Sequence, residues 1–124
     1  MIFIDRSIPK SVAEALQCVR DDVEWLEPRF PHDTSDVDWL AEAGRNGWLV
    51  VSRDKHISRR PAERRAIQDH GVGCFIITTR KNLTRWEYLK LFAAHLDAMI
   101  EVFDATERPF IWTVERRGIA RKIL

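Results

Sequence analysis

The chain has 124 residues, enough for one domain with its own hydrophobic core and no stabilising disulfides. Hydrophobic residues make up 45% and charged residues 31%, and no apolar run approaches the roughly 18 residues of a membrane span. The net charge of +1 hides an asymmetry, because residues 1–50 hold 5 Lys/Arg against 10 Asp/Glu and residues 51–124 hold 15 against 9. These values exclude membrane proteins, and the absence of a secretory signal pattern predicts a cytoplasmic protein.

Short apolar runs alternate with helical patterns along the chain. Strands are expected over residues 2–4, 23–26, 48–51, 74–77 and 109–114. Helices are expected from about residue 7 to 20, then over 36–46, 61–70 and 84–103. Residues 28–35 form a loop, and the last ten residues form a possible basic tail. This alternation predicts an α/β fold with a mainly parallel sheet of about five strands, covered by helices on both faces.

The ends of the helices carry recognisable signals. Pro9 lies in a first turn, Gly47 and Gly71 follow the second and third helices, and Thr84 with Glu87 forms a capping box. The first helix has apolar residues at Val12, Leu16 and Val19. The longest helix carries a core stripe of Tyr88, Leu91, Phe92, Leu96, Met99 and Phe103. Trp39, Trp48 and Trp86 fall on apolar stretches and are also expected in the core.

Three aspartates are the strongest candidates for chemistry. Asp5 follows the run Ile2–Ile4, Asp54 follows the run Trp48–Val51, and Asp36 opens a helix. The carboxyl ends of parallel strands meet at one edge of a sheet, where ligands bind. Gathered there, the carboxylates would repel each other unless a cation joined them, and oxygen ligands favour Mg²⁺ or Mn²⁺. A metal-polarised water could then hydrolyse a phosphodiester without a side-chain nucleophile.

Each aspartate also has a simpler structural explanation. Asp5 could be a helix cap or turn former, Asp54 could be a turn residue, and Asp36 suits the first turn of a helix through the helix dipole. The joint pattern favours Asp5, Asp36 and Asp54 as catalytic and metal-binding residues over these separate roles.

A basic segment surrounds Asp54. Arginine and lysine contacts to phosphates give sequence-independent affinity for nucleic acid, although a solvated basic face is the simpler alternative. The predicted substrate-binding residues are Arg6, Arg53, Lys55, Arg59 and Arg60.

Three motifs resemble the PIN-like domain family, in particular its VapC-type toxin branch. They are Phe3–Arg6, Asp33–Trp39 and above all Gly47–Lys55, and the resemblance covers residues 1 to about 80. It implies a single three-layer α/β/α domain over residues 1–124, with Asp5, Asp36 and Asp54 as first, second and third acids. Such domains often have a fourth acid after the fourth strand, where this chain has the sequence of residues 78–82 without a carboxylate. Asn82 and Glu63 are open alternatives for that role.

The resemblance also implies a function. It predicts a hydrolase: a Mg²⁺- or Mn²⁺-dependent endoribonuclease, the toxin of a type II toxin–antitoxin pair. RNA and a cognate antitoxin are the implied partners, and such toxins often dimerise with a second copy of the chain. The missing fourth acid leaves a second hypothesis open, a PIN-like binding module of weakened catalysis that acts through RNA or partner contact.

Overall fold

The computed structural model describes residues 1–79 and 81–124. A sheet of six strands lies at its centre, in the order β2-β1-β3-β4-β5-β6. The strands are β1 (Ile2–Ile4), β2 (Val23–Trp25), β3 (Leu49–Ser52), β4 (Gly73–Ile77), β5 (Phe110–Glu115) and β6 (Gly118–Lys122). All neighbours pair in parallel except β5 and β6, which form an antiparallel hairpin. The predicted α/β class and mainly parallel sheet are confirmed.

The last strand differs from expectation. Residues 118–122, considered a possible basic tail, pair with β5 as β6. The pairing extends to the end of the chain, because Ile123 donates from its backbone N–H to the Ile111 carbonyl at 2.9 Å. β6 is an edge strand, so its basic side chains can remain in solvent. Charged residues are common on edge strands because they hinder pairing with another strand.

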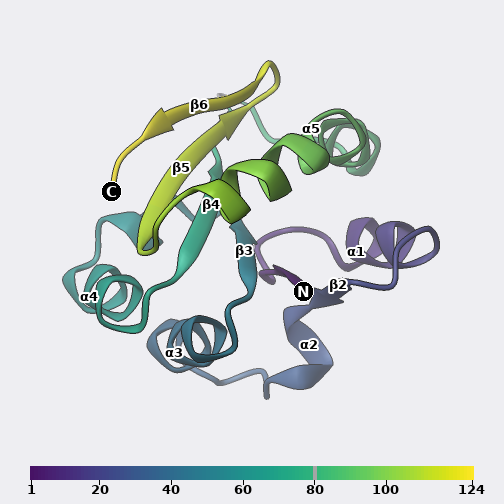
Figure 1. Ribbon diagram of the computed structural model, residues 1–124. Coiled ribbons are helices and arrows are strands. Elements are labelled where there is room, and N and C mark those ends of the chain that lie inside the picture. The colour runs from purple at the N-terminus through teal and green to yellow at the C-terminus, as the bar shows by residue number, and fades with distance from the viewer. Residues whose placement is uncertain (80) are drawn as a thin grey trace.

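Helices cover both faces of the sheet (Figure 1). They are α1 (Lys10–Gln17), the irregular turn α2 (Leu26–Arg29), α3 (Asp36–Asn46), the short 3₁₀ segment η1 (Lys55–Ser58), α4 (Pro61–His70) and α5 (Arg85–Ala105). The helices α1 and α5 pack on one face, and α3 and α4 pack on the other. The strands β1, β3 and β4 are buried throughout, as continuous apolar runs covered on two faces require.

The predicted ends of α3 and α4 and the predicted cap of α5 are confirmed. Gly47 and Gly71 end α3 and α4 with φ of 67° and 65°, in the left-handed region that glycine enters without a Cβ clash. Thr84 and Glu87 form the capping box of α5, and all six residues of the predicted stripe are buried. In contrast α1 ends at Gln17, so Val19 lies beyond it and is 81% exposed.

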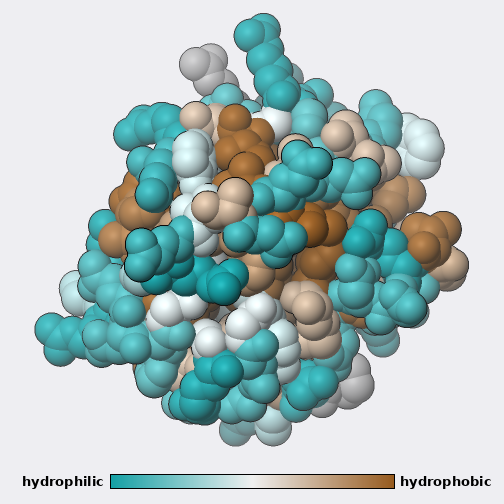
Figure 2. Space-filling view, viewed as in Figure 1, coloured by the Kyte–Doolittle hydropathy of each residue, from teal (hydrophilic) through white to brown (hydrophobic). Residues whose placement is uncertain are grey.

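Hydrophilic residues cover most of the face seen in Figure 1, and apolar atoms appear between α5 and α1 (Figure 2). The large hydrophobic residues that stay exposed include Met1, Val19 and Trp86. The prediction that Trp86 lies in the core is therefore wrong, whereas Trp39 and Trp48 are buried as predicted. Among the described residues, no helix combines the length and apolar character needed to cross a membrane.

Candidate functional site

The order of the strands creates a crevice between β1 and β3. From β1 the chain goes to β2 on one side, and then crosses to β3 on the other side. Such a switch point opens a crevice at the carboxyl ends of the two strands, where open α/β sheets bind ligands. Asp5 follows β1 there, and Arg53 and Asp54 follow β3.

Asp5 fills this crevice and joins the two strand ends. Its side chain is buried, at 3% exposure. Oδ2 accepts hydrogen bonds from the hydroxyls of Ser7 at 2.7 Å and Ser52 at 2.8 Å. Oδ1 accepts one from the backbone N–H of Arg6 at 2.8 Å.

The two hydroxyls extend the network to the turn after β3. The backbone N–H of Arg53 donates to Ser7 Oγ at 2.9 Å, and that of Asp54 donates to Ser52 Oγ at 3.0 Å. Each hydroxyl thus accepts from the turn and donates to the same carboxylate oxygen. Asp5 therefore fixes the β3–η1 turn in place through two hydroxyl relays.

Burial dominates the ionisation of Asp5. Removal from water raises its pKa above the usual 3.8, hydrogen bonds from Ser7 and Ser52 partly offset this, and the negative charge of Asp36 raises it again. The net effect is a raised pKa of Asp5. The contribution of Asp36 means that the charges of the two carboxylates interact.

Asp36 and Asp54 have local structural partners. Asp36 begins α3, and its Oδ1 accepts a hydrogen bond from the Trp39 indole at 2.8 Å. Its Oδ2 lies 3.9 Å from an Arg60 nitrogen. Asp54 caps η1, since its Oδ1 accepts from the backbone N–H of His56 at 2.9 Å. The sequence had suggested a first-turn position for Asp36 and a turn position for Asp54 as the simpler alternatives.

The expected gathering of the three carboxylates is not seen. In the described residues, no group of three or more Asp, Glu, His or Cys side chains is close enough to hold a metal ion. The physical reason is that the chain bends at Asp54 to begin η1, which turns this carboxylate to its own backbone. Glu63 was an alternative fourth ligand, and its Oε1 lies 3.9 Å from a guanidinium nitrogen of Arg60. Arg80, which belongs to the segment 78–82 after β4, lies outside the described part of the chain.

The described residues therefore contain no preformed three-carboxylate centre. A carboxylate has about four acceptor positions; the hydrogen bonds described here occupy three on Asp5 and one on Asp36. Mg²⁺ often takes only one or two protein carboxylates and keeps its remaining ligands as water. Asp5 and Asp36 are the two residues that could hold such an ion.

Two of the predicted phosphate-binding arginines are used inside the protein. Arg6 donates to the carbonyl oxygens of His32 and Thr34 and so holds the loop before α3. Arg53 donates to the Thr79 hydroxyl and to the carbonyl of Lys81 at 2.9 Å, which fixes the loop after β4. Their guanidinium groups hold loops around the crevice.

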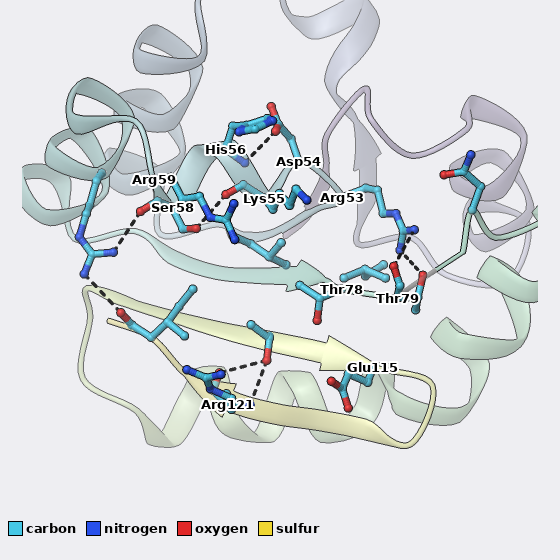
Figure 3. A pocket seen from close by; sticks show the side chains of 16 residues that line it. Arg53, Asp54, Lys55, His56, Ser58, Arg59, Thr78, Thr79, Glu115 and Arg121 are labelled. Carbon is cyan, nitrogen blue, oxygen red and sulfur yellow. Dashed lines mark hydrogen bonds between the residues drawn. The ribbon is translucent and has the colours of Figure 1, made fainter.

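A wide groove lies beside the crevice, across the ends of β4 and β5. It has a volume of about 930 Å³, and η1 and the β5–β6 hairpin form its two sides (Figure 3). Asp5 and Asp36 are outside its lining, whereas Asp54 is on its rim. Thr78 and Thr79 line its floor where β4 ends.

The groove is positively charged. Five arginine and lysine residues line it against two carboxylates, Asp54 and Glu115. In the described part of the chain none of the five has a carboxylate oxygen within 4.0 Å. The cationic residues of the lining are Arg53, Lys55, Arg59, Arg64 and Arg121.

The cations divide by what their side chains contact. Arg53 is bonded to the loop after β4, and Arg64 donates to the carbonyl oxygens of Ser58 and Ile123. Lys55, Arg59 and Arg121 are exposed, and no hydrogen bond of their side chains is found within the described residues. These three side chains are available to a ligand.

The sequence identified part of this groove. Lys55 and Arg59 were predicted as substrate contacts and line it, whereas Arg6 and Arg60 do not belong to its lining. Arg121 was assigned to a possible tail, so its place opposite η1 was missed. Only the pairing of β6 with β5 brings it there. The available signal was the spacing of Ile119 and Ile123, which are four residues apart and would share one face of a regular strand.

The domain is of the doubly wound α/β class, in which ligands bind at the carboxyl ends of the strands beside the switch point. The profile of the PIN-like domain family matches residues 1–79, almost two-thirds of the chain. The chain belongs to the PIN-like domain family, whose fold is generally that of a nuclease. Searches of curated proteins and of solved structures give no significant match.

Proposed function

We propose that this protein is an endoribonuclease that binds RNA in the basic groove and cuts phosphodiesters at the adjoining Asp5 crevice. The observation that carries the proposal is the groove, where exposed Lys55, Arg59 and Arg121 have no acidic partner among the described residues. A polyanion would supply the missing negative charge, and displacement of its counterions would favour binding. The family supports the nuclease part of the proposal.

The acids would serve at the crevice as a pair. Asp5 is held rigidly by three hydrogen bonds, and Asp36 lies within electrostatic range of it. A Mg²⁺ or Mn²⁺ ion held by the two would supply a polarised water for hydrolysis. Asp54 would act indirectly, because its cap on η1 positions Lys55 and Arg59 at the groove.

The proposal extends to a biological role. We propose that the protein is the toxin of a type II toxin–antitoxin pair acting in the cytoplasm, with an antitoxin and a second copy of the chain as candidate protein partners. Expression should arrest growth, and co-expression of the small protein encoded beside it should relieve the arrest. Arrest that persists with Asp5→Asn, or no arrest at all, would contradict the toxin role.

The cleavage test uses structured and single-stranded RNA with Mg²⁺ or Mn²⁺. Asp5→Asn and Asp36→Asn should each abolish cleavage, and EDTA should abolish it in the wild type. Asp104→Asn is the matched control, since Asp104 is an exposed acid on α5. Cleavage by Asp5→Asn at the wild-type rate would remove the hydrolytic role.

A second function is favoured by one observation. The three acids do not gather within the described residues, and Asp5 already has three hydrogen bonds. The chain would then be a PIN-like binding module of weakened catalysis. RNA binding without cleavage, together with no heat of Mg²⁺ or Mn²⁺ binding that depends on Asp5, would select this function.

A further inference from the structure

The pairing of β6 with β5 is interrupted by one extra residue. Val114 pairs with Ile119, but the next pair along the hairpin is Trp112 with Lys122. Between these two pairs β5 has one residue and β6 has two. An extra residue of this kind is a β-bulge, which bends its strand and changes the direction of the side chains around it. Bulges are frequent at sheet edges and beside functional sites.

The bulge, at Ala120 and Arg121, decides which face the end of β6 presents. Ile119 and Ile123 would share one face of a regular strand. Instead Ile119 packs on the core beneath α1 and α5, and Ile123 packs on the core beneath α3 and α4. Without the extra residue Arg121 would pair with Trp112, which packs on the α5 side. The bulge instead brings Arg121 to the groove, opposite η1 (Figure 3).

The hydroxyl of Thr113 fastens the bulged residue. A bulge disrupts the ladder and leaves its extra residue unpaired on the neighbouring strand. Thr113 is the single residue of β5 opposite the bulge, and its side chain supplies the missing partner. Its Oγ1 accepts a hydrogen bond from the backbone N–H of Arg121 at 3.0 Å and donates to the carbonyl oxygen of Arg121 at 3.4 Å. The hydroxyl therefore fixes the backbone from which the Arg121 side chain extends.

Packing alone does not require a hydroxyl at this position. Thr113 lies opposite Ile76 of β4 and shares a face of β5 with Ile111, two residues before it. Valine has nearly the same shape and would suit this apolar row. Beyond the bulge, the backbone N–H of Ile123 donates to the Ile111 carbonyl at 2.9 Å, so the end of β6 is held independently. The particular contribution of the hydroxyl is the position of Arg121.

We propose that Thr113 is a positioning residue for RNA binding, because its hydroxyl holds the bulge that places Arg121 against a phosphate group in the groove. This inference rests on the proposed RNA-binding role of the groove. Arg121 is exposed and has no carboxylate oxygen within 4.0 Å among the described residues. Fixing its backbone in advance lowers the entropy cost of the contact.

Both residues belong to the C-terminal hairpin, beyond residues 1–79 that match the family profile. The hairpin therefore adds a phosphate contact to the part of the chain that matches the family. The contact comes from the side of the groove opposite Lys55 and Arg59, so cations would hold the RNA backbone from both sides.

A double-mutant cycle tests the coupling between Thr113 and Arg121. Binding of an end-labelled RNA oligonucleotide is measured by fluorescence anisotropy at several KCl concentrations, in EDTA to prevent cleavage. Arg121→Ala should weaken binding about fivefold. Thr113→Val should weaken binding about two- to fivefold in the wild type and have no further effect in Arg121→Ala. Thr113→Ser keeps the hydroxyl and should bind RNA like the wild type.

Two controls separate failure of this inference from failure of the groove. Arg59→Ala removes a phosphate contact on the η1 side and should weaken binding by the same factor with or without Thr113→Val. Thr106→Val makes the same exchange after the end of α5, where the hydroxyl has no hydrogen bond among the described residues, and should change nothing. Urea unfolding of every variant reports the effect on stability.

Each result decides between the alternatives. Equal weakening by Thr113→Val with and without Arg121, or weakening by Thr113→Ser as large as by Thr113→Val, overturns the positioning role. A lower urea midpoint of Thr113→Val with unchanged affinity means that the hydroxyl serves only the fold, which also overturns it. Weakening by Arg59→Ala and none by Arg121→Ala overturns the contact at Arg121 and leaves the groove intact. No effect of either arginine variant overturns RNA binding by the groove itself.

Discussion

The Asp5 crevice and the basic groove lie at the same edge of the sheet, yet their polar groups are used in opposite ways. In the crevice a buried carboxylate accepts three hydrogen bonds from the protein itself. In the groove Lys55, Arg59 and Arg121 extend into solvent without a partner in the described residues. The carboxylate of the crevice holds the strand ends together, whereas the exposed cations of the groove are available to bind an anionic ligand. The two can therefore be tested separately, by stability and by affinity.

The largest expected effect is on stability, from Asp5→Ala. The hydroxyls of Ser7 and Ser52 would lose their acceptor in a buried place, and the turn after β3 would lose its anchor. The free energy of unfolding should fall by about 2 to 3 kcal/mol. Urea denaturation measures it, with Asp104→Ala on the exposed side of α5 as control. An unchanged midpoint would mean that the relay contributes nothing to the fold.

Removal of a groove cation should affect affinity and spare stability. Arg121→Ala should weaken RNA binding by about 1 kcal/mol and reduce the slope of log affinity against log salt by about 0.7 to 0.9. Its unfolding midpoint should stay within about 0.5 kcal/mol of the wild type, since its exposed side chain has no described partner. Loss of stability with unchanged affinity would reverse the assigned roles of groove and crevice.

Asp54→Ala should affect both regions slightly. The loss of the cap on η1 should cost about 1 kcal/mol of unfolding free energy. RNA affinity should fall less than with Arg121→Ala, because Lys55 and Arg59 remain but are held less firmly. Asp54→Asn can still cap and should recover most of the stability. If Asp54→Asn instead abolishes cleavage while binding and stability are retained, Asp54 acts at the reacting centre.

The smallest expected effect is on pH dependence. The pKa of Asp5 is raised in the folded state, so the folded protein holds this proton more tightly than the unfolded chain. Stability measured relative to Asp5→Asn should therefore decline as pH rises from the unfolded pKa near 3.8 through the folded pKa, and then level off. Asp36→Asn removes a negative charge and should make this decline smaller.

Calorimetric unfolding across this pH range gives the measurement. A rise in relative stability with pH would mean that the hydrogen bonds of Ser7 and Ser52 outweigh burial. Mg²⁺ bound at Asp5 should also reverse the decline, because a cation favours the ionised carboxylate. The same titration with and without Mg²⁺ therefore also tests the proposed carboxylate pair.

The sequence by itself determined the local structure and the place of the crevice. Continuous apolar runs predicted the buried central strands, and Gly47, Gly71 and the Thr84 cap set the ends of helices because these signals act within a few residues. The positions of Asp5 and Asp54 after two strands followed from the rule that parallel strands share one carboxyl edge.

Tertiary structure decided where the side chains point and with which groups they pair. Asp54 turns to cap η1, Arg53 bonds to the loop after β4, β6 brings Arg121 to the groove, and Trp86 faces solvent. A sequence pattern gives the strand end to which a residue belongs, but hydrogen bonds between distant segments compete for each polar group. That competition is settled only when the segments meet, since its outcome depends on distances of a few ångströms across the fold.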